Sequence, residues 1–447
     1  MKIREIFIEQ NHLKHYDDEF KGIHFDTRQI SAGQIFVAIK TEKNDGHNYV
    51  EDAIINKEIA GAIIDKNYLE RFDRSLYKYL VPVNNVENYL IEKGKFFLDK
   101  LNLKYKIAIT GTVGKTTTKE LCASMLNKKF RVYKSFKNFN NFLGLIYNIF
   151  NIPEGTEIVV FEIGTNYPGE IDFLASIINP HIGIITKIGH GHLEFFKDLE
   201  NVAKEKADIF RYLQRDKIAI FNKEDSILQK YIKAFDIKKK VIIEYGKDYL
   251  LNGNILQYAN RSFEINSYIL PYIDNLALVL ALADYFDINN KLIQQSIDEF
   301  KPSDKRMEII ELNNILIIND CYNSNPDSME LFIRTATHLS NEKKKELVFV
   351  LGDMFELGEL AVDLHKKIGN LLLNYNENIM KIFALGDYSR YFIEGNSKGE
   401  FFNNDRNALF DRLKACLGDD IIIGVKGSRG MRMEEITERI LGYVKGA

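Results

Sequence analysis

Short apolar runs alternate with amphipathic stretches along most of this chain. In its central part, helical spacing separates four strand-like runs, at residues 106–110, 157–162, 181–186 and 217–222. Strands that alternate with helices in this way are typical of a mostly parallel, doubly wound sheet. After residue 301 the pattern restarts and predicts a second α/β sheet, with strands at 315–320, 346–351, 381–385 and 420–425, each followed by a helical stretch.

The first hundred residues carry a weaker version of the same pattern. Apolar runs at 34–39 and 60–64, with turn signals at Gly33 and at Asp45-Gly46, predict a small α/β domain, and a helical stretch at 86–101 follows it. We therefore expect three domains, at 1–100, 101–308 and 309–447. The fold class predicted is α/β throughout: a small N-terminal α/β domain, a central P-loop ATPase-like parallel-sheet domain and a C-terminal Rossmann-like α/β domain.

Composition excludes several functional classes. The 447 residues suit about three domains, and 60 Lys and Arg against 63 Asp and Glu leave no polycationic surface for nucleic acid. Three separated cysteines form no CxxC pair, which argues against a disulfide framework or zinc site and favours a reducing compartment. Since the chain has neither a leader-like start nor an uninterrupted apolar run of about 18 residues, we expect a soluble, cytoplasmic protein without membrane insertion.

One loop carries the strongest chemical signal. Residues 110–117 read T-G-T-V-G-K-T-T between a predicted strand and a predicted helix, where backbone N–H groups can hold phosphates. Lys115 would contact the β- and γ-phosphates and Thr116 would bind Mg²⁺. Ile109 stands where the common form of this loop has Gly, which disfavours ordinary GTPases and motor-type ATPases. The competing interpretation is a glycine-rich turn with an incidental lysine.

Two further strand ends carry candidate metal ligands. Glu162 ends one predicted strand, and another runs into a loop that contains His190 and His192. Ligands in open α/β sheets collect beyond the carboxyl ends of the strands, so an oxygen ligand and an imidazole there could complete a divalent-metal site. The alternative is that each loop histidine is a surface group. Spacing alone favours a solvated helix face for the charged stretch Lys204, Glu205, Lys206 and Asp208.

Taken together, these motifs resemble the Mur ligase family, the ATP-dependent amide ligases of peptidoglycan precursor synthesis. The resemblance covers nearly the whole chain. It rests on the phosphate loop, D-T-R at 26–28, D-G-H at 45–47, N-F-N-N at 138–141, F-E-I-G at 161–164, H-L-E at 192–194 and V-A-K-E-K-A-D at 202–208. Residues 319–329, N-D-C-Y-N-S-N-P-D-S-M, resemble the signature of the members that add D-alanyl-D-alanine, with Asn319 in place of an Asp. Lys305 stands where the family usually has Gly.

The resemblance implies an ATP site and two metal sites. Its cofactor-binding residues would be Gly111, Thr112, Val113, Gly114, Lys115, Thr116, Thr117, Asn275, Arg306 and Asp320. Thr116 and Glu162 would hold one Mg²⁺, and His192 with a carbamylated Lys206 would form the second metal site. Lys115, His192 and Lys206 would be the catalytic residues.

The implied substrates are UDP-MurNAc-tripeptide and D-alanyl-D-alanine, joined through an acyl phosphate to give UDP-MurNAc-pentapeptide. The implied substrate-binding residues are Thr27, Arg28, Asp45 and His47 in the first domain, Asn138, Asn140 and Asn141 in the second, and Asn323, Asn325 and Ser328 in the third. We expect a monomer. Three alternatives remain at this point: another ligase of the family, a folylpolyglutamate synthase-like relative, and a nucleotide-dependent binding protein without turnover.

Overall fold

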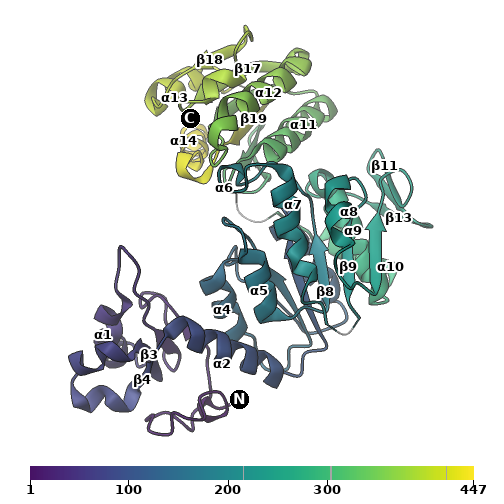
Figure 1. Ribbon diagram of the computed structural model, residues 1–447. Helices are drawn as coiled ribbons and strands as arrows, with labels where there is room; N and C mark the ends of the chain where they lie inside the picture. The colour runs from purple at the N-terminus through teal and green to yellow at the C-terminus, as the bar shows by residue number, and fades with distance from the viewer. Residues whose placement is uncertain (215, 303–304, 419, 447) are drawn as a thin grey trace.

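The computed structural model describes residues 1–214, 216–302, 305–418 and 420–446. Figure 1 shows three bodies in an extended row, with the N-terminal part at one end, the central part in the middle and the C-terminal part at the other end. Their strands form separate sheets, and the central body carries a small additional sheet. None of the described helices combines the length and apolar character that crossing a lipid bilayer requires.

The N-terminal sheet has four parallel strands in the order β1-β2-β3-β4. Its strands are β1 (Ile23–His24), β2 (Ile35–Val37), β3 (Gly61–Asp65) and β4 (Leu80–Val83), and α1 (Val50–Asn56) packs on β3. The helix α2 (Val86–Lys100) then begins at the Asn85 cap and packs against α4 (Phe142–Phe150) and α5 (Glu170–Ile178) of the central body. The expected boundary after residue 100 falls at the end of this helix.

The central sheet has six strands in the order β10-β9-β8-β5-β7-β6, all parallel, which confirms the predicted sheet. Its strands are β5 (Tyr105–Thr110), β6 (Val132–Lys134), β7 (Ile158–Glu162), β8 (Ile182–Ile185), β9 (Ile218–Asn222) and β10 (Lys239–Ile243). Its remaining helices are α3 (Lys115–Leu126), α6 (Leu193–Phe196), α7 (Leu199–Ala207), α8 (Ser226–Ile232), α9 (Ile273–Tyr285) and α10 (Asn290–Asp298).

The sequence pattern missed the edge strands and the small sheet. The edge strand β6 is short, and both β6 and β10 are partly exposed, so they lack the apolar run that marks a central strand. The small antiparallel sheet consists of β11 (Tyr249–Asn252), β12 (Ile255–Tyr258) and β13 (Arg261–Glu264). Figure 1 shows it on the side of the central body away from α4 and α5.

The C-terminal sheet has the order β14-β15-β19-β16-β17-β18, parallel except for β14. Its strands are β14 (Glu308–Leu312), β15 (Ile315–Asp320), β16 (Glu346–Gly352), β17 (Ile379–Leu385), β18 (Gly399–Phe401) and β19 (Ile421–Lys426). The expected boundary at 308/309 falls within the first two residues of β14.

Alternating side chains of this sheet enter two separate cores, as the period of two along a strand requires. Leu316 and Ile318 pack in the core with residues of α11 (Pro326–Lys343) and α12 (Ala361–Asn374). Ile315 and Ile317 pack in the core with residues of α13 (Arg406–Lys414) and α14 (Glu434–Gly446). The sheet is therefore covered on both faces, and the carboxyl ends of β15 and β19 lie at the junction with the central body.

Candidate active site

The phosphate loop follows β5 directly and ends where α3 begins at Lys115. Gly114 has φ of +86°, and a Cβ there would lie 2.3 Å from Asn275 Nδ2, so only glycine fits. Asn275 also donates to Thr118 Oγ1 over 3.0 Å, which ties α9 to the start of α3. The sequence-predicted residue Asn275 therefore packs directly against the loop.

Lys115 folds back over its own loop. Its Nζ donates to the carbonyl oxygens of Gly111, at 2.7 Å, and Thr112, at 3.3 Å. Burial lowers the pKa of Lys115 to about 8; Glu162 opposes this shift and Arg306 adds to it. A half-buried cation bound to neutral carbonyls is well placed to exchange them for phosphate oxygens.

Thr116 and Glu162 meet beside the loop, as the sequence predicted. The Thr116 hydroxyl donates to Glu162 Oε2 over 2.9 Å, and Asn140 Nδ2 donates to Glu162 Oε1 over 2.9 Å. Hydroxyl and carboxylate oxygens suit Mg²⁺, which usually completes its shell with water and phosphate. Within the described ranges no group of three or more His, Cys, Asp or Glu side chains could hold a metal ion.

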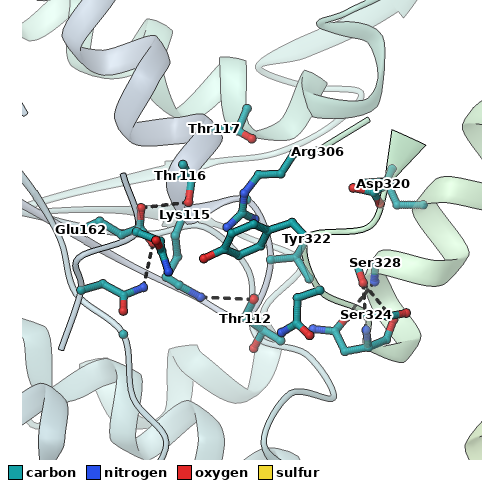
Figure 2. A pocket seen from close by; sticks show the side chains of 18 of the residues that line it. Thr112, Lys115, Thr116, Thr117, Glu162, Arg306, Asp320, Tyr322, Ser324 and Ser328 are labelled. Atoms are coloured by element: carbon teal, nitrogen blue, oxygen red, sulfur yellow. Dashed lines mark hydrogen bonds between the residues drawn. The ribbon is translucent and has the colours of Figure 1, made fainter. Parts of the chain in front are cut away.

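The loop faces a cavity of about 290 Å³ between the central and C-terminal bodies. Figure 2 shows Thr116 and Glu162 on one side, Asp320, Ser324 and Ser328 on the other, and Arg306 with Tyr322 between them. The Arg306 guanidinium lies 3.7 Å from the centre of the Tyr322 ring, a cation–π contact. Residues from distant segments thus converge on one polar cavity.

Asp320 is held at this cavity by Lys426, at the carboxyl ends of the neighbouring strands β15 and β19. Lys426 Nζ donates to Asp320 Oδ2 over 2.5 Å and to the Asn323 carbonyl over 2.9 Å, and its side chain is 1% exposed. The second Asp320 oxygen accepts from the backbone N–H of Met307 over 3.1 Å. This buried pair fixes the Asp320 carboxylate at the cavity wall.

We expect Lys426→Met to lower the free energy of unfolding of the C-terminal body by about 3–5 kcal/mol, because it leaves the buried Asp320 charge without its partner. Urea unfolding followed by circular dichroism measures this loss. Lys414→Met is the matched control: its ion pair with Asp411 lies on the surface, and its loss should cost about 1 kcal/mol or less. Equal losses in the two variants would show that the buried Lys426–Asp320 pair contributes no more to stability than a surface ion pair.

Several predicted substrate residues have local structural roles. Asn325 caps α11, and its side-chain oxygen accepts from the Ser328 N–H while the Ser328 hydroxyl accepts from the Asn325 N–H. Asn141 caps α4 by accepting from the Gly144 N–H over 2.9 Å. The predicted residues that line the cavity beside the loop are Asn138, Asn140, Asn323, Asn325 and Ser328.

The other two residues predicted to be catalytic, His192 and Lys206, lie in different surroundings. His192 lines the cavity, and its Nδ1 lies 2.6 Å from Glu356 Oε2 of the C-terminal body. Lys206 lies on α7 and is 2% exposed, so the solvated face favoured by spacing alone is wrong for this residue. Its neighbour Glu205 is also buried and accepts from the N–H groups of Gly169 and Ile171 at the start of α5.

The sequence-predicted residues of the first body form two local pairs. Arg28 makes a bidentate ion pair with Asp26, and the Arg28 guanidinium lowers the Asp26 pKa to about 2. His47 contacts Asp45 Oδ1 over 2.7 Å and stacks on Tyr68 at 3.8 Å. Thr27 lies half-buried in the turn beside Arg28. The cavity described above is lined by residues of the central and C-terminal bodies. The predicted residues of the first body therefore lie apart from it.

Sequence reasoning missed a buried lysine beside Glu162. Lys119 is completely buried, donates to the Ser135 carbonyl over 2.9 Å, and lies 3.7 Å from Glu162 Oε2. Its position in a charged helical stretch gave no sign of burial. The backbone explains the usual Gly at position 305, because Lys305 has φ of +59°, the left-handed region that favours glycine.

The fold and the site define a P-loop α/β ATPase-like protein whose cavity is closed by a C-terminal α/β domain. The chain belongs to the Mur ligase family. The family models for the Mur ligase middle domain and for the Mur ligase glutamate ligase domain match residues 109–293 and 305–429.

The relatives agree with this assignment over almost the whole length. The chain is 31% identical to the UDP-N-acetylmuramoyl-tripeptide–D-alanyl-D-alanine ligase of Bacillus subtilis, covering 94% of this chain and 93% of the relative. Its fold is similar to that of MurF from Acinetobacter baumannii, with a TM-score of 0.80 at 22% identity, covering 99% and 98% of the two chains. MurF from Thermotoga maritima in complex with ADP gives a TM-score of 0.80 at 21% identity, covering 95% and 98%.

Proposed function

We propose that this chain is an ATP-dependent ligase that joins D-alanyl-D-alanine to UDP-MurNAc-tripeptide, forming UDP-MurNAc-pentapeptide for peptidoglycan synthesis. The observation that carries the proposal is the convergence of an intact phosphate loop, the Thr116–Glu162 pair and the residues 320–328 on one cavity. The full-length similarity to a ligase of that name supports the choice of substrates. A cytoplasmic monomer of three domains, with the boundaries given above, is part of this proposal.

The chemistry explains why ATP is needed. A carboxylate is a poor acyl donor because an oxide would have to leave. Transfer of the γ-phosphoryl group to the tripeptide carboxylate gives an acyl phosphate and ADP. The dipeptide amine then attacks the acyl carbon, and the tetrahedral adduct expels phosphate. The protein must therefore position the reactants and neutralise clustered negative charge.

Different residues would bind the phosphates, the nucleoside and the metal ion. Lys115 would contact the β- and γ-phosphates, with Gly114 allowing the close approach, and Asn275, Arg306 and Asp320 would lie on the adenine and ribose side. Thr116 and Glu162 would hold Mg²⁺, which supplies charge neutralisation when bound. Closure of the C-terminal domain over the cavity would exclude water that could hydrolyse the acyl phosphate.

We propose further that Lys206 is carbamylated and serves, with His192, a second metal site. Carbon dioxide reacts with a neutral amine, and burial together with the Lys115 charge lowers the pKa of Lys206 to about 7. The Lys206 amine is therefore neutral more often than that of an ordinary lysine at neutral pH. The carbamate converts a buried cation beside Lys115 into an anion, which removes their repulsion.

The substrate-binding residues are proposed on the same basis. Thr27, Arg28, Asp45 and His47 would contact the uridine end of the first substrate, which must then extend from the N-terminal domain towards the cavity. Asn138, Asn140 and Asn141 would lie near the substrate and phosphates. Asn323, Asn325 and Ser328 would lie near the incoming dipeptide, on the opposite wall.

We expect purified protein to release ADP and phosphate only when ATP, UDP-MurNAc-tripeptide and D-alanyl-D-alanine are all present. Single amino acids replacing the dipeptide test for another ligase of the family, and glutamate with a folate acceptor tests for a folylpolyglutamate synthase-like activity. Product mass spectrometry identifies the pentapeptide. Preferential ligation of a single amino acid, or nucleotide binding without single-turnover phosphate release, would contradict the proposal.

A further inference from the structure

The loop 353–358 of the C-terminal domain lies against the loop that carries His192 in the central domain. Glu356 Oε2 lies 2.6 Å from His192 Nδ1, an ion-pair contact without the alignment of a hydrogen bond, and the Glu356 carbonyl accepts from the Glu194 N–H over 3.1 Å. A Cβ on Gly358 would lie 3.3 Å from the Glu194 Cα. A side-chain contact, a backbone hydrogen bond and close packing therefore join the two loops across the domain junction.

The loop is also held by hydrogen bonds within the C-terminal domain. Met354 N–H donates to Nε2 of the buried His365 over 3.0 Å, and His365 Nδ1 lies 2.6 Å from the Ala361 carbonyl. The carbonyl can only accept, so His365 carries its proton on Nδ1 and is neutral. Phe355 N–H donates to the Ser428 hydroxyl over 2.8 Å. These contacts present the next residue, Glu356, towards the central domain.

Glu356 occupies a strained backbone position. Its φ is +62°, a conformation that costs a side-chain-bearing residue about 1–2 kcal/mol and that glycine adopts freely. Strain of this kind persists where the surroundings enforce it and is concentrated at functional sites. The glutamate side chain lines the same cavity as His192 and contacts that ring. This backbone conformation places the Glu356 carboxylate beside His192.

We propose that Glu356 is a positioning residue for the ligation reaction: its carboxylate holds the proton of His192 on Nδ1 and leaves Nε2 as the atom that acts in the cavity. The inference rests on the proposed function. A histidine that binds a metal ion or phosphate with one ring nitrogen commonly donates from the other to a carboxylate, which fixes the ring and its tautomer. Here that carboxylate comes from another domain, so His192 is correctly set only when the C-terminal domain is docked.

The first test is spectroscopic and needs no ligation activity. Protein labelled with ¹⁵N-histidine should show the His192 ring protonated on Nδ1, with the signal assigned among the nine histidines by its absence from His192→Gln. Glu356→Gln should shift this signal towards the Nε2–H tautomer, since an amide holds the Nδ1 proton less strongly. Glu359→Gln, at an exposed residue just after the loop, should leave the signal unchanged. An unchanged His192 signal in Glu356→Gln would overturn the proposal.

The second test is kinetic. Glu356→Gln should lower kcat about 10- to 100-fold with little change in KM for ATP, and Glu359→Gln should match the unmodified protein. In a His192→Gln background, Glu356→Gln should cause no further loss, because the carboxylate acts through that ring. Additive losses, or a rise in KM alone, would show that Glu356 acts otherwise. Absence of ligation by the unmodified protein would instead contradict the proposed function and leave the spectroscopic test intact.

Discussion

Lys115→Ala is expected to lower ATP-dependent ligation by at least about 100-fold, because it removes the cation of the phosphate loop, which would face the transferred phosphoryl group. Lys115 Nζ is bound by carbonyls of its own loop, so the substitution breaks no ion pair that stabilises the fold. Phosphate release at saturating substrates measures the loss. Binding of UDP-MurNAc-tripeptide, measured by calorimetry, should remain largely intact because the proposed uridine residues lie in another domain.

The control for this variant is Lys230→Ala, which removes a surface lysine paired with Glu200 and should retain full activity. Loss of both ligation and UDP-substrate binding in Lys115→Ala would indicate misfolding. Near-normal ligation in a folded Lys115→Ala protein would show that the loop does not hold the reacting nucleotide.

The Lys206→Ala variant should lose most activity, and high bicarbonate should not restore it, because alanine has no amine to carbamylate. The neighbouring Lys204→Ala is a close control: both lysines lie on α7, but Lys204 is exposed and Lys206 is buried. With ¹³C-bicarbonate, a carbamate NMR signal should be present in the unmodified protein and in Lys204→Ala and absent from Lys206→Ala.

Near-normal turnover of Lys206→Ala would show that the carbamate has no part in the reaction. A variant that unfolds is recognised from its circular dichroism spectrum. Lys206→Gln, which keeps most of the length of the side chain without a reactive amine, then replaces it. Loss of activity with no carbamate signal in the unmodified protein would leave Lys206 essential as an amine and would refute its modification.

Local pattern was sufficient for the central strands and for the phosphate loop. The runs that became β5, β7, β8, β15, β16 and β19 are nearly continuous in apolar residues, since a strand covered on both faces has no polar side to show. The loop at 111–114 is equally local, because its glycines and the helix start lie within a few residues. Edge strands such as β6 and β10 have one free edge and fewer apolar positions, so the same reasoning missed them.

Burial of charge could not be derived from spacing. Spacing does not distinguish Lys204 from Lys206 in this charged helix. Lys204 is exposed and Lys206 is buried, because the rest of the central domain covers only one side of α7. Lys119 is likewise hidden, next to Glu162. Which face of a helix is covered depends on distant elements. Periodicity therefore did not distinguish Lys206, and only the resemblance to the family singled it out.

The sequence by itself thus determined the kind of sheet, the nucleotide loop and the strand-end carboxylate at Glu162. The tertiary structure alone decided which residues meet across the domain junction, such as His192 with Glu356. The physical reason is the range of the interactions. Strand and loop propensities act between neighbours in the chain, whereas ion pairs and desolvation depend on distance in space, which exists only after the domains have folded and docked.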